Sequence, residues 1–164
     1  MNYKMIARVL GLVLLCLACF MLLPAAVGLF YGENISGFAL SALLSAALGF
    51  GLTRLRPGRS TIYAREGYLA VGLAWILVSV LGMLPYLISG DIPRVEDALF
   101  ESVSGFTTTG ATVLKDIEHM SRSGMLWRLF TQWIGGMGVL VFMMAVMPMG
   151  GEHSMHIIPA EFPG

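Results

Sequence analysis

The chain has 164 residues, of which 57% are hydrophobic and 12% are charged, and its formal net charge is zero. A soluble domain of this size could not bury so much apolar surface, so the composition predicts a membrane protein. The balanced charge favours neither nucleic acid nor an acidic partner.

Four uncharged runs are each long enough to cross a bilayer as a helix, which takes about 20 residues. They cover residues 9–32, 34–53, 67–90 and 129–151. The first two runs predict a helical hairpin with a tight turn at 31–34, and this hairpin with its following loop makes up residues 1–66. Small residues recur in the second run, a pattern typical of close helix packing in membranes.

Four crossings place both termini on one side of the membrane. That side would carry six basic residues, against four on the other side: Lys4, Arg8, Arg54, Arg56, Arg59 and Arg65. The positive-inside rule therefore predicts a multi-pass membrane protein with both termini in the cytoplasm and the loop at 114–122 outside.

A short amphipathic helix is predicted at residues 94–105, after the third crossing. Pro93 is expected in its first turn, and its apolar side would carry Val95, Leu99, Val103 and Phe106. Twelve residues span roughly 18 Å, well short of the ~30 Å hydrocarbon core. The helix must therefore end inside the membrane.

The segment that follows, SGFTTTGATV at 104–113, is rich in hydroxyl and glycine residues. Non-helical backbone at membrane depth is tolerated where protein buries it or where it lines a watery path. Thr107, Thr108, Thr109 and Gly110 offer successive carbonyls that can replace the hydration shell of a potassium ion. Gly110 can adopt a positive φ that turns carbonyls toward one axis. These features predict a selectivity filter over residues 107–113.

Two other interpretations of this segment stay open. It resembles in composition a capped helix end, as in a non-conducting assembly module. Secondary transporters that couple potassium to another cation also contain broken helices at membrane depth. Glu101 lies within the short helix, and ionisable groups at membrane depth are rarely without a role. We expect it to face an outer vestibule or to bond the filter backbone, and so to support the site.

The last crossing begins with polar and aromatic residues that predict an interfacial belt on the outer side: Trp127, Arg128, Gln132 and Trp133. Three glycines follow at 135, 136 and 138, and we expect them to allow close packing against the short helix.

Four segments carry a family resemblance: REGYLAVGLAW from Arg65, DALFESVSGFTTTGATVL from Asp97, TQWIGGMGVLVF from Thr131 and AEFPG from Ala160. With them the chain resembles the N-terminal part of the Trk/Ktr/HKT superfamily of potassium transporters, most closely the bacterial Trk-type membrane subunit. The resemblance implies a transporter of the bacterial inner membrane and not an enzyme, with potassium as substrate and no cofactor.

The resemblance also implies an all-α, potassium-channel-like pore of four fused helix–pore helix–filter–helix repeats. This chain would supply the leading hairpin, the first repeat at 67–151 and the link at 152–164, as a fragment of a longer protein. Its implied partners are potassium, membrane lipid, the remaining repeats, a second copy in a homodimer and a cytosolic nucleotide-binding regulatory subunit. The implied site comprises potassium at Thr108 and Thr109, the flanking Thr107 and Gly110, and the supporting residues Glu101, Ala111 and Thr112. A glycine at position 110 points to potassium rather than sodium.

Overall fold

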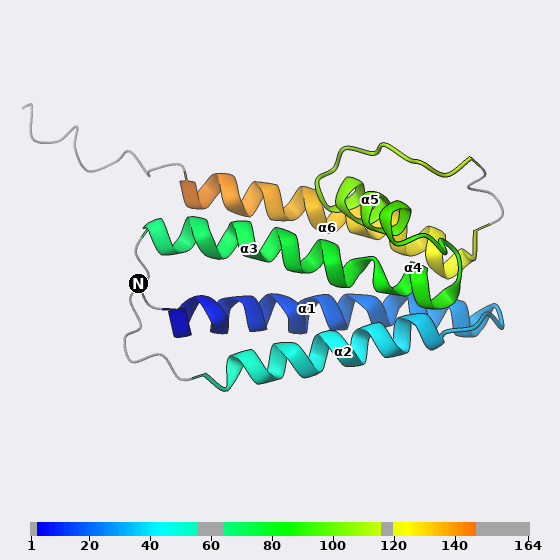
Figure 1. Cartoon of the computed structure of the whole chain (residues 1–164), viewed down its shortest axis with the longest axis horizontal. Helices are drawn as coiled ribbons and strands as arrows, with labels where there is room; N and C mark the ends of the chain where they lie inside the picture. Colours follow the sequence, from blue (N-terminus) through cyan, green and yellow to red (C-terminus); the bar gives the residue numbers. More distant parts are fainter. Residues whose placement is uncertain (1–2, 56–63, 116–119, 147–164) are drawn as a thin grey trace, which may run out of the picture.

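The computed structural model describes residues 3–55, 64–115 and 120–146, and the regular structure within them is helical (Figure 1). Six helices follow in chain order: α1 Tyr3–Phe30, α2 Ser36–Thr53, α3 Ala64–Gly82, α4 Leu84–Ser89, α5 Val95–Phe106 and α6 Arg122–Val146. The predicted all-α class is confirmed, and the short helix lies within one residue of its predicted bounds.

The four long helices α1, α2, α3 and α6 lie side by side, and each runs opposite to the long helix before it in the chain, so that the neighbours α1 and α3 are parallel (Figure 1). The α1–α2 turn, α4, α5 and the start of α6 share one end of this bundle, which we call the turn end. Three of the described helical stretches are long and apolar enough to span a bilayer: Tyr3–Phe30, Ser36–Thr53 and Glu66–Ser89. The fourth predicted crossing, residues 129–151, coincides with α6 as far as Val146. Its last residues, 147–151, lie outside the described part.

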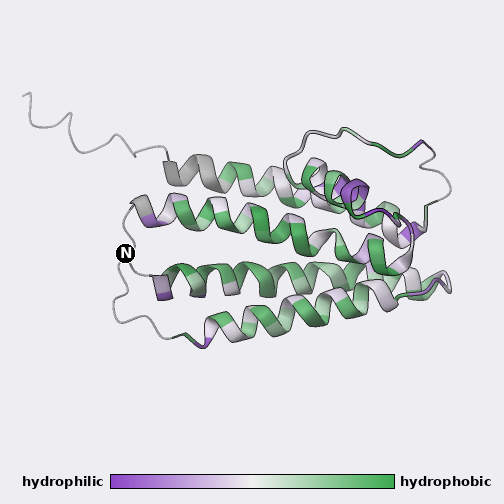
Figure 2. Cartoon of the chain, viewed as in Figure 1, coloured by the Kyte–Doolittle hydropathy of each residue, from purple (hydrophilic) through white to green (hydrophobic). Residues whose placement is uncertain are grey.

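Hydropathy follows this arrangement. Hydrophobic residues cover the lengths of the long helices, and hydrophilic ones gather at the helix ends and on α5 (Figure 2). Large apolar side chains such as Leu40, Leu43 and Phe50 on α2 are more than half exposed in this chain, at 54%, 67% and 54%. Such an exposed apolar surface suits contact with lipid or with other membrane helices.

Small residues bring α1 and α2 together as the sequence predicts. The buried face of α2 repeats them at every fourth position, in Gly37, Ser41, Ser45 and Gly49. A Cβ placed on Gly11 of α1 would lie only 2.7 Å from the carbonyl oxygen of Gly49. The two backbones therefore touch, which requires glycine on both helices.

The third predicted crossing, residues 67–90, is confirmed as long and apolar enough to span a bilayer, but its helix is interrupted near one end. It divides into α3 and α4 at Met83, because Pro85 has no N–H and its ring disfavours a straight helix at this point. The N–H groups of Tyr86 and Leu87 both bond to the Met83 carbonyl, at 3.1 and 3.3 Å. The chain then leaves α4 through Gly90, which has a φ of 83°.

Trp127 anchors the packing around this break. Its side chain is fully buried, and its indole N–H donates to the carbonyl of Gly82 at 2.9 Å. The ring meets Phe106 edge-on, with the ring centroids 6.3 Å apart. The expectation that Trp127 belongs to an interfacial belt is therefore wrong, because the bulky ring fills the space where α3, α5 and α6 meet.

Candidate functional site

The short helix α5 buries a polar face. Its N-cap is Arg94, so Pro93 precedes the cap and is not in the first turn as expected. Val95, Leu99 and Val103 share one side by their four-residue spacing. In this chain Val95 and Val103 are 55% and 39% exposed, whereas Phe106 is fully buried. The residues that α5 buries are Ala98, Glu101, Ser102, Ser104, Gly105 and Phe106. Hydrogen bonds, described below, explain why these polar groups can leave water.

The chain that follows α5 turns its N–H groups back toward the helix end. Thr107, Thr108 and Thr109 donate to backbone carbonyls of α5 at 2.9, 2.9 and 3.0 Å, and Gly110 donates at 3.4 Å. In a trans peptide the carbonyl points opposite to the N–H of the same plane. The carbonyls of the three threonines therefore point away from α5. Residues 107–113 are exposed in the described chain.

Two residues of this segment have left-handed backbone conformations. Gly110 has a φ of 73°, as expected for a residue that must turn the chain. Thr108 has a φ of 58°, which was not foreseen and is unusual for a β-branched residue. A helix commonly ends with one left-handed residue, usually glycine. Holding a threonine there costs about 1–3 kcal/mol, so the surrounding contacts must fix it.

Glu101 ties the segment to α5 and α6. Its side chain is 1% exposed and accepts hydrogen bonds from the Thr112 hydroxyl at 2.5 Å and the Val113 N–H at 2.8 Å. Its other oxygen pairs with Arg128 of α6 at 2.9 Å. Of the two expectations for Glu101, bonding to the backbone is the one observed. Arg128 was assigned to an interfacial belt, which is wrong, because it neutralises this buried carboxylate.

The hydroxyls of the segment form a directed chain. Thr107 donates its proton to the carbonyl of Val103 at 2.8 Å. The Thr107 and Thr109 hydroxyl oxygens are 2.9 Å apart, so Thr109 must be the donor of that pair. Among the described residues no group of three or more His, Cys, Asp or Glu side chains could hold a metal ion. The oxygens that Thr107, Thr108, Thr109 and Gly110 present are backbone carbonyls and hydroxyls, which carry no net charge.

Of the three glycines expected to pack closely against α5, Gly135 of α6 does so, whereas Gly138 faces Trp75 of α3. A Cβ at Gly135 would overlap the carbonyl oxygen of Phe106, and a Cβ at Gly105 would overlap the Thr131 hydroxyl. Gly136, in contrast, faces the Thr108 side chain at an ordinary 3.9 Å. The backbone just before the exposed threonines is therefore fixed by direct contact with α6.

Comparison with known sequences assigns the chain to a protein family. The TrkH family, described as cation transport protein, matches residues 33–163 of the chain. The chain belongs to the TrkH family. It is 36% identical to the Trk system potassium uptake protein TrkH of Salmonella typhimurium, over all of this chain and 35% of that protein. It is 34% identical to an uncharacterized cation transporter of Methanocaldococcus jannaschii, over 89% of this chain and 31% of that protein.

A solved structure agrees with this TrkH-family assignment. The fold superimposes on the crystal structure of the potassium transporter TrkH from Vibrio parahaemolyticus with a TM-score of 0.82 and 32% identity. The match covers 98% of this chain and 36% of that one. This TrkH-family chain thus spans about a third of the length of the relatives it matches.

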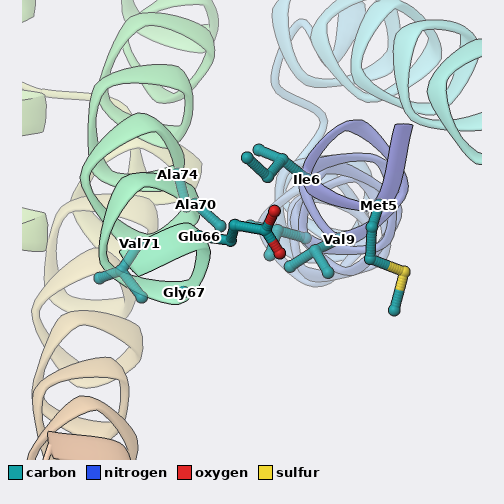
Figure 3. Close-up of a pocket in the computed structure, with 9 residues that line it drawn as sticks. Met5, Ile6, Val9, Glu66, Gly67, Ala70, Val71 and Ala74 are labelled. Atoms are coloured by element: carbon teal, nitrogen blue, oxygen red, sulfur yellow. The ribbon is translucent and has the colours of Figure 1, made fainter. Parts of the chain in front are cut away.

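A cavity of this TrkH-family chain lies at the end of the bundle opposite the turn end, between α1 and α3. It has a volume of about 190 Å³, and apolar residues of both helices line it, including Ile6, Val9 and Ala70. The Glu66 side chain is 5% exposed and extends from α3 into the space between the two helices (Figure 3). The cavity and α5 lie at opposite ends of the bundle, so the cavity is remote from the exposed threonines that follow α5 (Figure 1).

Proposed function

We propose that the chain is the N-terminal part of a potassium uptake transporter and that residues 107–110 form one of its four filter strands. The observation that carries the proposal is the direction of the threonine carbonyls, which point away from α5 because the N–H groups of 108–110 bond to it. Potassium would bind at Thr108 and Thr109, flanked by Thr107 and Gly110. The relatives named potassium uptake proteins support this choice of ion.

The electrostatics of the segment fit a conducting site. A potassium ion that leaves water needs oxygens that replace its hydration shell, yet fixed charges beside it would hold it too tightly. The carboxylate of the preceding helix, Glu101, is buried behind the segment and paired with Arg128. The exposed side of the segment therefore offers dipoles without a net charge.

The rest of the transporter is part of the same proposal. Residues 1–66 form the leading hairpin, 67–151 the first pore repeat with its filter at 107–113, and 152–164 the link to three further repeats. The protein would lie in the bacterial inner membrane with both termini cytoplasmic and the turn end outside, need no cofactor, form a homodimer and bind a cytosolic nucleotide-binding regulatory subunit. A cysteine at Ser121 should then react with an outside reagent, and one at Ser60, which lies outside the described residues, should not.

Gly110→Ser in the complete transporter tests the proposal. A serine at a φ of 73° strains the backbone and adds a Cβ beside the carbonyls. We expect weaker discrimination of potassium over sodium, with normal accumulation in the membrane. The measurement is rubidium uptake, with sodium as competitor, in cells that lack their own potassium uptake.

Gly32→Ser is the matched control. Gly32 has a nearly equal φ of 71°, but it lies in the α1–α2 turn with open space around it. This variant should carry the same backbone strain and keep the parental selectivity. Unchanged selectivity in a well-accumulated Gly110→Ser protein would instead show that the segment only caps α5, as in a non-conducting module.

A further inference from the structure

Ser104 bonds to both sides of Gly110. Its backbone carbonyl accepts the N–H groups of Thr109 and Gly110, at 3.0 and 3.4 Å. Its hydroxyl donates to the carbonyl of Ala111 at 2.6 Å. The side chain belongs to α5 and is 5% exposed, so water does not compete freely for these bonds. One residue of α5 thus holds the backbone before and after the filter glycine.

The hydroxyl bond gives the Ala111 carbonyl a direction opposite to its predecessors. The carbonyls of Thr107, Thr108 and Thr109 point away from α5, whereas that of Ala111 points toward it. The reversal takes place across Gly110, whose positive φ permits it. The row of outward-facing carbonyls therefore stops before Ala111.

We infer that Ser104 is a positioning residue for ion selectivity, which ends the row of ion-facing carbonyls at Gly110 and keeps the Ala111 carbonyl out of it. The inference rests on the proposed function of residues 107–110. Selectivity in a carbonyl filter depends on the number and direction of its oxygens. Without the hydroxyl, the Ala111 peptide loses the bond that turns its oxygen inward, and the coordination changes.

Glu101 does not perform the same task. It lies one helical turn earlier and holds the Thr112 hydroxyl and the Val113 N–H, both beyond Ala111. Those two bonds fix where the chain goes after the filter. Among the contacts that the structure describes, only the Ser104 hydroxyl acts on the Ala111 carbonyl.

Ser104→Ala in the complete transporter tests the inference, with Ser102→Ala as the matched control. Ser102 is also buried on α5, and its hydroxyl donates to a backbone carbonyl, that of Ser79, at 2.7 Å. Both variants lose one hydroxyl-to-carbonyl hydrogen bond of similar length, but only Ser104→Ala frees a filter carbonyl. The measurement is the ratio of rubidium to sodium uptake in potassium-uptake-deficient cells, normalised to the amount of protein in the membrane.

We expect Ser104→Ala to lower the uptake ratio roughly fivefold, the factor that corresponds to one typical hydrogen bond, and Ser102→Ala to keep the parental ratio. A parental ratio in Ser104→Ala, or an equal loss in Ser102→Ala, would overturn the inference. If Ser104→Ala does not accumulate, Ser104→Cys replaces it, because a thiol keeps the shape but is a weak donor. A parental ratio in that variant overturns the inference as well.

Gly110→Ser, measured in parallel, distinguishes a failure of the role of Ser104 from a failure of the proposed function of residues 107–110. A lowered ratio in Gly110→Ser with a parental ratio in Ser104→Ala refutes the role of Ser104 and keeps the proposed function. Parental ratios in both variants refute the proposed function, and the role of Ser104 with it.

Discussion

Gly135→Ala should displace the start of the exposed threonine segment 107–110, and the close contacts of Gly135 set the size of the displacement. A Cβ at this position would overlap the Phe106 carbonyl oxygen and lie 2.8 Å from the Phe106 carbonyl carbon. Ordinary contact begins near 3.4 Å, so the backbones must separate by at least about 0.6 Å. Neither contact is with a flexible side chain. We expect a loss of about 1–3 kcal/mol of stability, the usual range for an overpacked core.

The same displacement should alter transport, because Phe106 directly precedes Thr107. Thermal unfolding of the complete transporter in detergent measures the first effect, and rubidium uptake per membrane-inserted protein measures the second. Gly136→Ala is the control on the adjacent position of α6, where the new Cβ would lie 3.9 Å from Thr108. It should be neutral or slightly stabilising, since alanine favours a helix over glycine. Equal stability and uptake in Gly135→Ala and Gly136→Ala would refute the prediction that a Cβ at position 135 displaces Phe106.

Three further predictions concern strain, charge pairing and pH. Thr108→Gly should raise thermal stability by about 1 kcal/mol, because glycine relieves the left-handed strain at a φ of 58°; a destabilised variant would contradict this. Arg128→Gln should lower stability by about 3–5 kcal/mol because it leaves the Glu101 carboxylate buried without its partner; the double variant with Glu101→Gln should unfold at a higher temperature than the single one. Burial raises the pKa of Glu33, but the hydrogen bonds from Ser123 and the α6 backbone, with the adjacent arginine, outweigh it, so the net pKa is lowered. The stabilisation by the ionised Glu33 is therefore present above the usual carboxyl pKa and is lost as the pH falls through the lowered pKa. The difference in unfolding temperature between the parent and Glu33→Gln should shrink on acidification. A pH-independent difference would refute an ionic role for Glu33.

The sequence was sufficient to predict the parts of the fold that depend on hydropathy and length. The hairpin with its small-residue face and the short helix at 94–105 follow from local patterns, and the structure has them. The break between α3 and α4 was missed because both pieces are equally apolar. Pro85 was the available signal, since a proline removes one helical hydrogen bond wherever it falls inside a helix.

The contacts around residues 107–113 could be predicted only in part. Gly110 was expected to have a positive φ because only glycine does so without strain, and it does. The pairing of Glu101 with Arg128 was missed because it joins two helices across 27 positions of the sequence. The spacing of Trp127, Thr131 and Gly135, each four residues apart on α6, could have indicated one face in contact with α5.

The structure shows that capping α5 and exposing carbonyls are one geometry, because the N–H groups that cap the helix fix the direction of the carbonyls behind them. A helix cap and a potassium filter must therefore be distinguished by contacts that a helix cap does not require. A cap alone favours glycine at the left-handed position, yet Thr108 occupies it at a cost in strain. It also gives no reason to bury a carboxylate against Thr112, or to hold the Ala111 carbonyl with Ser104. These contacts fix the course of the chain beyond the helix end, which is what an ion path requires of its backbone.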